Sequence, residues 1–207
     1  MESNTSAQYD EVVKICKEIF LKKTQDYGES WRVLRLPSIT DQIFIKARRI
    51  RRLEELQGRH KISEGVEVEY SGIVNYCVMA LIKLSSVDIS EQNIYNNSAW
   101  LKSPDFSSNE KSIGELSKQY DAVIAKTKDL MERKNYDYGE AWRDMRLSSI
   151  TDQILVKTLR IKQIEEHEGQ VLVSEGLEAE YNDILNYCVF ALIRLKNRHV
   201  SENSPPY

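Results

Sequence analysis

Apolar residues recur every three or four positions along most of the chain, which is the spacing of helices that bury one face. Alternating strand patterns are scarce, and the stretch VLVSEG from Val171 is the one candidate for a short extended piece. None of the four prolines falls inside a predicted helix, where it would break the hydrogen-bond ladder. The pattern therefore predicts an all-α protein with helices over about 7–23, 39–56, 64–84, 116–133, 150–167 and 175–196.

The chain contains one large internal repeat. Residues 8–84 align with 119–195 without a gap, and just over half of the positions are identical. Two copies of one unit predict two tandem three-helix modules packed about a pseudo-two-fold axis, like a homodimer fused into one chain. Modules that sit apart like beads are the alternative. The expected boundaries are 1–84 for the first module, 85–113 for a polar linker, 114–198 for the second module and 199–207 for a disordered tail.

Composition restricts the function classes. Charged residues make up 29% of the chain and the net charge is −3, so no basic field favours DNA or anionic lipid. No apolar run is long enough to span a membrane, and the start MESNTSAQYDE lacks the order of a secretory signal. Three cysteines, two of them in apolar helical pattern, favour reduced core thiols. We expect a cytoplasmic protein without membrane or direct DNA contacts, with further homo-oligomerisation left open.

Charged positions that both copies keep are candidates for structure or chemistry that the modules share. Asp152, Lys157 and Arg160 border the apolar stripe of one predicted helix, and Glu180 and Asp183 stand one turn apart on the next. Two neighbouring carboxylates repel each other unless a cation or a proton lies between them. Carboxylate oxygens suit Mg²⁺ or Mn²⁺, so Asp152, Glu180 and Asp183 are the predicted metal ligands. Lys157 and Arg160 would then face the phosphates of a substrate as catalytic residues.

The same charged residues have a second explanation. The shared Lys and Arg side chains could form salt bridges to the shared Glu and Asp side chains and fix the register of the helices. Four further shared residues are candidates for substrate contacts, because aromatic rings stack on nucleobases and amides or phenols hydrogen-bond to a base or ribose. These are Tyr138, Trp142, Asn186 and Tyr187.

The two copies differ at one position of this cluster. Gly72 stands in the first copy where the second has Asp183, although Glu69 and Glu180 match. Glycine inside a helix costs roughly 1 kcal/mol relative to alanine, so a close helix approach or room for a ligand should accompany it. Our hypothesis is that the second module holds the ion, while the first contributes Lys46, Arg49 or the loop of Tyr27 and Trp31 to substrate binding.

The motifs K-x-x-DYG-x-x-W-R-x-x-R, S-I-T-D-Q-I-x-x-K-x-x-R-I and E-Y-x-D-I-x-N-Y-x-x-x-A-L-I occur in this chain. With them the chain resembles the nucleotide modification associated domain 1 family over nearly its whole length apart from tails and linker. That family is associated with nucleotide and DNA-base modification systems, and the resemblance implies a role in nucleotide metabolism or modification.

A looser similarity connects Glu180 and Asp183, an E-x-x-D pair, to the second metal motif of the MazG-like all-α NTP pyrophosphatases. That resemblance implies a MazG-like helical bundle and a Mg²⁺-dependent NTP or dNTP pyrophosphohydrolase. The helix that would carry the first acidic motif reads TDQILVKTLR, where Asp152 is the only acidic residue. The alternative is a non-catalytic helical module that binds a nucleotide or a partner enzyme of nucleotide metabolism.

Overall fold

The described residues of this protein are helical. The structure, a computed structural model, describes residues 5–56, 65–86, 110–167 and 176–202, and it contains no strand within these ranges. The predicted all-α fold is therefore confirmed. Its elements are α1 (Thr5–Tyr27), η1 (Ser30–Val33), α2 (Leu36–Leu56), α3 (Val66–Ser85), α4 (Glu110–Tyr138), η3 (Ala141–Asp144), α5 (Leu147–Glu166) and α6 (Gly176–Glu202).

Several helices are longer than their hydrophobic pattern predicts. Helix α1 continues through the DY of the DYG motif, and Gly28 ends it with a positive φ of 61°. The amide of Gly28 still donates to the Thr24 carbonyl at 2.8 Å, so the last turn of α1 is closed. Helix α2 begins at Leu36, three residues before the predicted start of 39. The propagation of backbone hydrogen bonds thus carries helices past their apolar stripes.

Some predictions fall wholly or partly on residues outside the described ranges. Helix α4 begins at Glu110, within the region expected to be linker, and α6 reaches Glu202, within the expected tail. Of the linker, residues 87–109 lie outside the described part of the chain, and of the tail, residues 203–207 do. Of the extended piece predicted at VLVSEG, residues 171–175 also lie outside it, and Gly176 is the first residue of α6.

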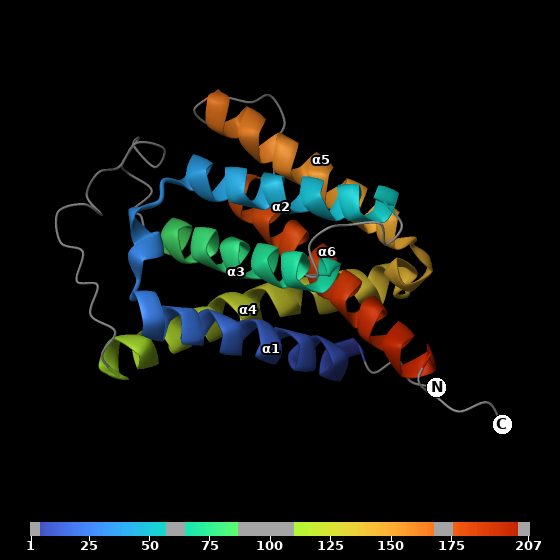
Figure 1. The fold of residues 1–207 in the computed structure, drawn as a ribbon, viewed down its shortest axis with the longest axis horizontal. Coiled ribbons are helices and arrows are strands. Elements are labelled where there is room, and N and C mark those ends of the chain that lie inside the picture. The colour runs from blue at the N-terminus through green and yellow to red at the C-terminus, as the bar shows by residue number, and fades with distance from the viewer. Residues whose placement is uncertain (1–4, 57–64, 87–109, 168–175, 203–207) are drawn as a thin grey trace.

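The six helices form three layers, and each layer pairs one helix of the first module with its equivalent from the second. Helices α2 and α5 form one outer layer, α3 and α6 the middle, and α1 and α4 the other outer layer (Figure 1). The middle helices contact both outer layers. The core also includes buried side chains of α2, namely Ile39, Ile43, Ala47 and Ile50.

Paired hydrogen bonds relate the two modules by a pseudo-two-fold axis. The Tyr9 hydroxyl donates to Oδ1 of Asn186 at 2.9 Å, and its repeat equivalent Tyr120 donates to Oδ1 of Asn75 at 3.0 Å. All four residues are buried. Because each bond joins one module to the other, the modules interlock and are not separate beads.

A second pair of networks joins α2 and α5 across the same axis. The hydroxyls of Thr40 and Tyr181 lie 2.7 Å apart, and Oε1 of Glu165 lies 2.7 Å from the Thr40 hydroxyl. Tyr70, Thr151 and Glu54 repeat this arrangement with distances of 2.8 Å. Burial raises the pKa of Glu165 to about 7.

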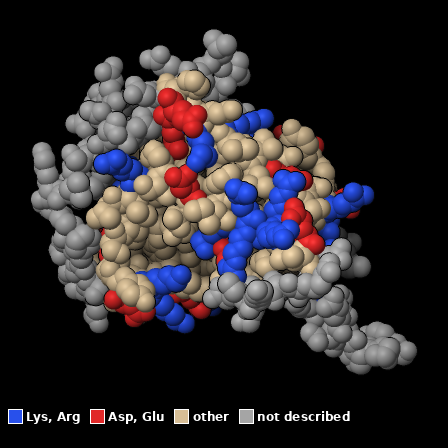
Figure 2. All heavy atoms as spheres, turned by 45° about the horizontal axis from the view of Figure 1, so that its top comes forward, with Lys and Arg blue, Asp and Glu red and all other residues tan. Residues whose placement is uncertain are grey.

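Charged residues on the outside are mixed in sign. On the face formed by α2 and α5, basic side chains lie beside acidic ones (Figure 2). Lys162 pairs with Asp41 at 2.5 Å, and Arg51 lies 3.7 Å from Asp152. These pairs again connect the two modules. The three cysteines are buried free thiols, and no helix within the described ranges is long and apolar enough to cross a membrane.

We predict that the stability of this protein falls as the pH rises from about 5 to about 8. The folded state raises the pKa of Glu165 from its ordinary value of 4.5 to about 7, so the folded chain keeps a proton that the unfolded chain releases. The contribution of this bound proton to the free energy of unfolding is complete below pH 4.5 and is lost as the pH rises through 7. Substitution Glu165→Gln should therefore reduce the slope of the thermal midpoint against pH by a few degrees over this window.

Differential scanning fluorimetry at several pH values checks this prediction. The pKa of Glu54 is also raised by burial, so the double variant Glu54→Gln/Glu165→Gln should have the flattest profile. A wild-type midpoint that rises steadily from pH 5 to pH 8 would contradict the assignment.

Candidate functional site

The DYG loop of the second module places an aromatic residue beside α6. Gly139 and Glu140 both have positive φ, 60° and 59°, so the chain turns sharply after α4. Helix η3 follows directly and presents Trp142 to the core. Arg143 fixes the turn: its Nε donates to Glu140 at 2.8 Å and its Nη2 donates to Gln8 of the first module at 2.9 Å.

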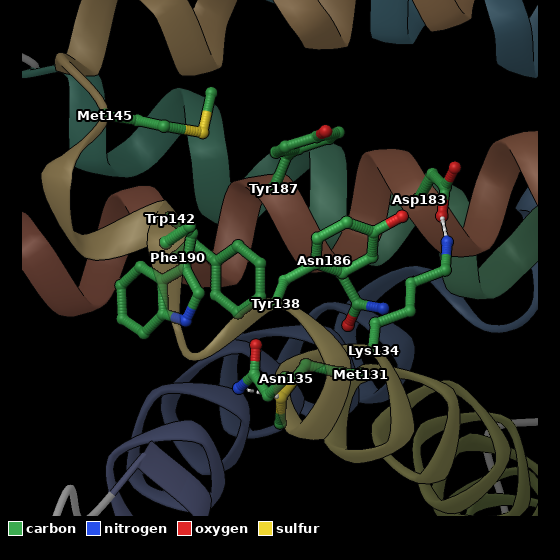
Figure 3. Close-up of a pocket in the computed structure, with 11 residues that line it drawn as sticks. Met131, Lys134, Asn135, Tyr138, Trp142, Met145, Asp183, Asn186, Tyr187 and Phe190 are labelled. Atoms are coloured by element: carbon green, nitrogen blue, oxygen red, sulfur yellow. Dashed lines mark hydrogen bonds and ion pairs between the residues drawn. The ribbon is translucent and has the colours of Figure 1, made fainter.

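A cavity of about 320 Å³ opens between α4, η3 and α6 (Figure 3). Its size is at the lower end of the range for small-molecule sites, and its wall combines aromatic, apolar and a few polar side chains. All four substrate-contact residues predicted in the second module line it. The lining residues are Met131, Lys134, Asn135, Tyr138, Ala141, Trp142, Met145, Asp183, Asn186, Tyr187 and Phe190.

The aromatic residues of the cavity differ in how available they are. The Trp142 ring stacks on Phe190 at 4.3 Å between centroids, and the Arg143 guanidinium lies 4.4 Å from its centroid, so its faces are largely engaged. Its Nε1 is nevertheless buried without a hydrogen-bond partner among the described residues. Tyr138 is 73% exposed and can move onto a ligand, whereas Tyr187 is half-buried with its ring edge-on to Phe190.

Asn186 lines the cavity but its side chain is already used. Its Oδ1 accepts from Tyr9, and its Nδ2 donates to the Thr127 carbonyl at 3.3 Å. An amide held by two buried bonds fixes the position of α6 against α1 and α4. Asn186 therefore shapes the site, and direct contact with a base would require it to give up one of these bonds.

At one end of the cavity, two carboxylates share one ammonium group. Nζ of Lys157 lies 2.8 Å from Asp183 and 3.2 Å from Glu180, and Nζ of Lys134 lies 2.6 Å from the other oxygen of Asp183. Although burial alone would raise the pKa of Asp183, the hydrogen bonds from Lys134 and Lys157 bring it below the ordinary value. Burial lowers the pKa of Lys157, and its bonds to Asp183 and Glu180 outweigh this and raise it.

The structure does not bring the three expected metal ligands together. Asp152 is five residues before Lys157 on α5, roughly 140° around the helix, and it faces Arg51 on α2. Glu180 and Asp183 are adjacent, but the Lys157 ammonium occupies the position between them. Within the described ranges, no group of three or more His, Cys, Asp or Glu side chains could hold a metal ion. This arrangement does not fit Mg²⁺ or Mn²⁺.

The other predicted residues lie on the rim or in the first module. Nη1 of Arg160 lies 3.9 Å from Glu180, and its side chain is 55% exposed. Lys46 and Arg49 both bind the buried Glu69 in the first module, with Lys46 at 3.0 Å. Lys46 lines a cavity of the first module and Arg49 lies beside it at Glu69. Neither residue lines the cavity of the second module.

Sequence reasoning missed Lys134 as a member of the site. The signal was present, because both copies carry a Lys three residues before the DYG motif. Phe190, which stacks on Trp142, was missed for another reason: Met79 occupies its place in the first copy, so comparison of the copies passes over it.

We predict that Lys157→Met destabilises the protein more than Lys46→Met. The first change leaves two largely buried carboxylates without their shared cation, and we expect a loss of about 2 kcal/mol or more in the free energy of unfolding. The matched change leaves only Glu69, which Arg49 still neutralises. Thermal denaturation at neutral pH measures both, and equal midpoints for the two variants would contradict the shared-ammonium geometry.

Comparison with known proteins assigns the chain to one family. The model of the family described as nucleotide modification associated domain 1 matches it twice, over residues 23–84 and 134–195. Each match spans one module from the end of its first helix to the last helix. Searches of curated proteins and of solved structures find no match. The chain therefore belongs to the nucleotide modification associated domain 1 family and carries that domain in two tandem copies.

Proposed function

We propose that this protein binds a nucleotide, with the base and sugar in the cavity of the second module. One observation carries the proposal: Tyr138, Trp142, Tyr187 and Asp183 come from three separate elements and line a single cavity. The description of the family supports a ligand of this class. The volume of about 320 Å³ suits the base and sugar and leaves the phosphates toward solvent.

The side chains of the cavity divide the recognition between them. The exposed ring of Tyr138 covers one face of the base, which contributes about 1–3 kcal/mol in comparable stacking contacts. The Asp183 carboxylate accepts hydrogen bonds from an amino or imino group on the base edge, and Lys134 donates to a carbonyl. The unpartnered Nε1 of Trp142 supplies a further donor. Such a set distinguishes bases by the pattern of their donors and acceptors.

Hydrolysis of the nucleotide is a second candidate, supported by one local observation. Lys157 holds a fixed positive charge between Glu180 and Asp183, and Arg160 stands beside Glu180. In this proposal Lys157 and Arg160 stabilise negative charge on the phosphates, which is the part that Arg and Lys take in phosphoryl transfer. The MazG-like similarity of the E-x-x-D pair points the same way, although the carboxylates as placed do not form a divalent-ion site.

We predict that Tyr138→Ala weakens nucleoside binding by about tenfold or more, from the loss of one stacking contact. The matched control is Tyr136→Ala, because Tyr136 is on the same helix, is 90% exposed and does not line the cavity. Isothermal titration calorimetry with a panel of standard and modified nucleosides measures both variants. Equal affinities for wild type and Tyr138→Ala, or no binding by wild type to any member, would refute the proposed pocket.

The hydrolase candidate predicts pyrophosphate or phosphate release from at least one nucleoside triphosphate. Asp183→Asn should then abolish turnover, because it weakens the contact that fixes Lys157. Release is followed with and without Mg²⁺, with wild type and variant side by side. Turnover that survives Asp183→Asn, or its absence with every substrate, removes this candidate and leaves the binding proposal in place.

A further inference from the structure

The first module contains its own cavity, built from the equivalent elements. It has a volume of about 300 Å³ and lies between α1, η1 and α3, with Tyr27, Trp31 and Tyr76 at the positions of Tyr138, Trp142 and Tyr187. Its charged lining residues are Lys23 and Lys46, and no Asp or Glu lines it. The cavity of the second module instead has one Lys and one Asp in its wall. The two cavities therefore share a shape and differ in charge.

Gly72 produces this difference, which accounts for a glycine in the interior of α3. A Cβ at this position would lie 3.0 Å from Cε, 3.1 Å from Nζ and 3.2 Å from Cδ of Lys46. The Lys46 side chain thus passes directly over the glycine and reaches the wall of the cavity. In the second module the equivalent Lys157 is bound by Asp183.

The cluster of charged residues at the first cavity is more positive by one charge than the equivalent cluster at the second cavity. Lys46 and Arg49 both bind the single buried carboxylate of Glu69, and Lys23 has no acidic partner among the described residues. In the second module Lys134, Lys157 and Arg160 face the two carboxylates of Glu180 and Asp183. An anion that enters the first cavity meets two ammonium groups and no lining carboxylate.

A buried donor also points to a ligand. Trp31 lines the first cavity and is 8% exposed, and its Nε1 has no hydrogen-bond partner among the described residues. Buried indole N–H groups ordinarily have a partner, so Nε1 of Trp31 is a donor that a ligand oxygen can bond once neighbouring side chains move to admit it.

We propose that the cavity of the first module is a second binding site, selective for a phosphate-bearing small molecule. Lys46 and Lys23 bind the phosphate, Trp31 donates to a ligand oxygen, and the exposed ring of Tyr27 covers the organic part. The site is distinct from the base-and-sugar cavity of the second module, and the assignment does not rest on that proposed function. The two copies thus keep cavities of similar shape that bind ligands of different charge.

Substitutions that exchange Gly72 and Asp183 between the two cavities test this proposal. Gly72→Asp gives the first cavity the carboxylate of the second, and the flexible end of Lys46 can move aside to pair with it. We expect the affinity for inorganic phosphate, which has no base or sugar for the second cavity to bind, to fall by about tenfold or more, as one charge-assisted contact is lost. Lys46→Gln should have the same effect without added bulk. Asp183→Gly, the reverse change, should add phosphate binding to the second cavity.

Isothermal titration calorimetry on the full chain measures the phosphate affinity of the wild type and of each variant, and circular dichroism verifies that each variant is folded. Inorganic phosphate binding that is unchanged in both Gly72→Asp and Lys46→Gln overturns the proposal, as does a wild type that binds no inorganic phosphate. A failure of nucleoside binding in the Tyr138→Ala experiment concerns only the second cavity. Phosphate binding that is lost in Lys134→Gln and kept in Lys46→Gln would place the anion in the second cavity and contradict the proposal.

Discussion

Two buried Tyr–Asn hydrogen bonds across the pseudo-two-fold axis hold both cavities in shape. Each asparagine, Asn75 and Asn186, accepts a hydroxyl from the opposite module and donates to a backbone carbonyl of the first helix of its own module. A buried amide left without these partners costs about 1–3 kcal/mol, so the helices have little freedom to slide. The cavities lie along these same helices. Their geometry is therefore a property of the whole interlocked chain and not of one module.

One aligned position, Gly72 in the first module and Asp183 in the second, sets the charge of each cavity wall. Asp183 draws Lys134 and Lys157 into a closed cluster at one end of the second cavity, which leaves a wall of nearly balanced charge. Gly72 removes the carboxylate and makes space for Lys46, so the first cavity keeps its positive charge. Two tyrosines and one tryptophan of the lining are the same in both modules, while Phe20 and Met79 of the first cavity stand where the second has Met131 and Phe190. Duplication with conserved shape and altered charge is a simple physical route to two ligand sites in one small protein.

The sequence alone predicted the helical class, the duplication and part of the lining of the second cavity. Tyr138, Trp142 and Tyr187 were found because both copies keep them, and the duplicated pattern implied the pseudo-two-fold packing. The same reasoning misplaced Asp152. Both copies also keep residues for contacts between modules, and Asp152 and Asp41 pair with Arg51 and Lys162 across the axis. Helical periodicity gives the face that a side chain occupies and does not show which neighbour that face meets.

Other features depend on packing details that a pattern does not contain. The rotamer of Lys157, which decides whether two carboxylates face a metal ion or an ammonium group, follows from the local packing of α5 against α6. The Thr40–Glu165–Tyr181 network needs three helices from both modules. Ile15 and Ile19 fit the apolar stripe of α1 and are nevertheless 50% and 38% exposed, because α1 lies in an outer layer.

The central claim is that two cavities of one shape take ligands of different charge, and the two indole N–H groups report on it directly. Trp31 and Trp142 each line one cavity, and the indole N–H of each gives a ¹H–¹⁵N signal that a single Trp→Phe substitution assigns. On titration, a nucleoside without phosphate should shift the Trp142 signal, and inorganic phosphate should shift the Trp31 signal. Shifts of both signals with both ligands, or of neither, would contradict the account.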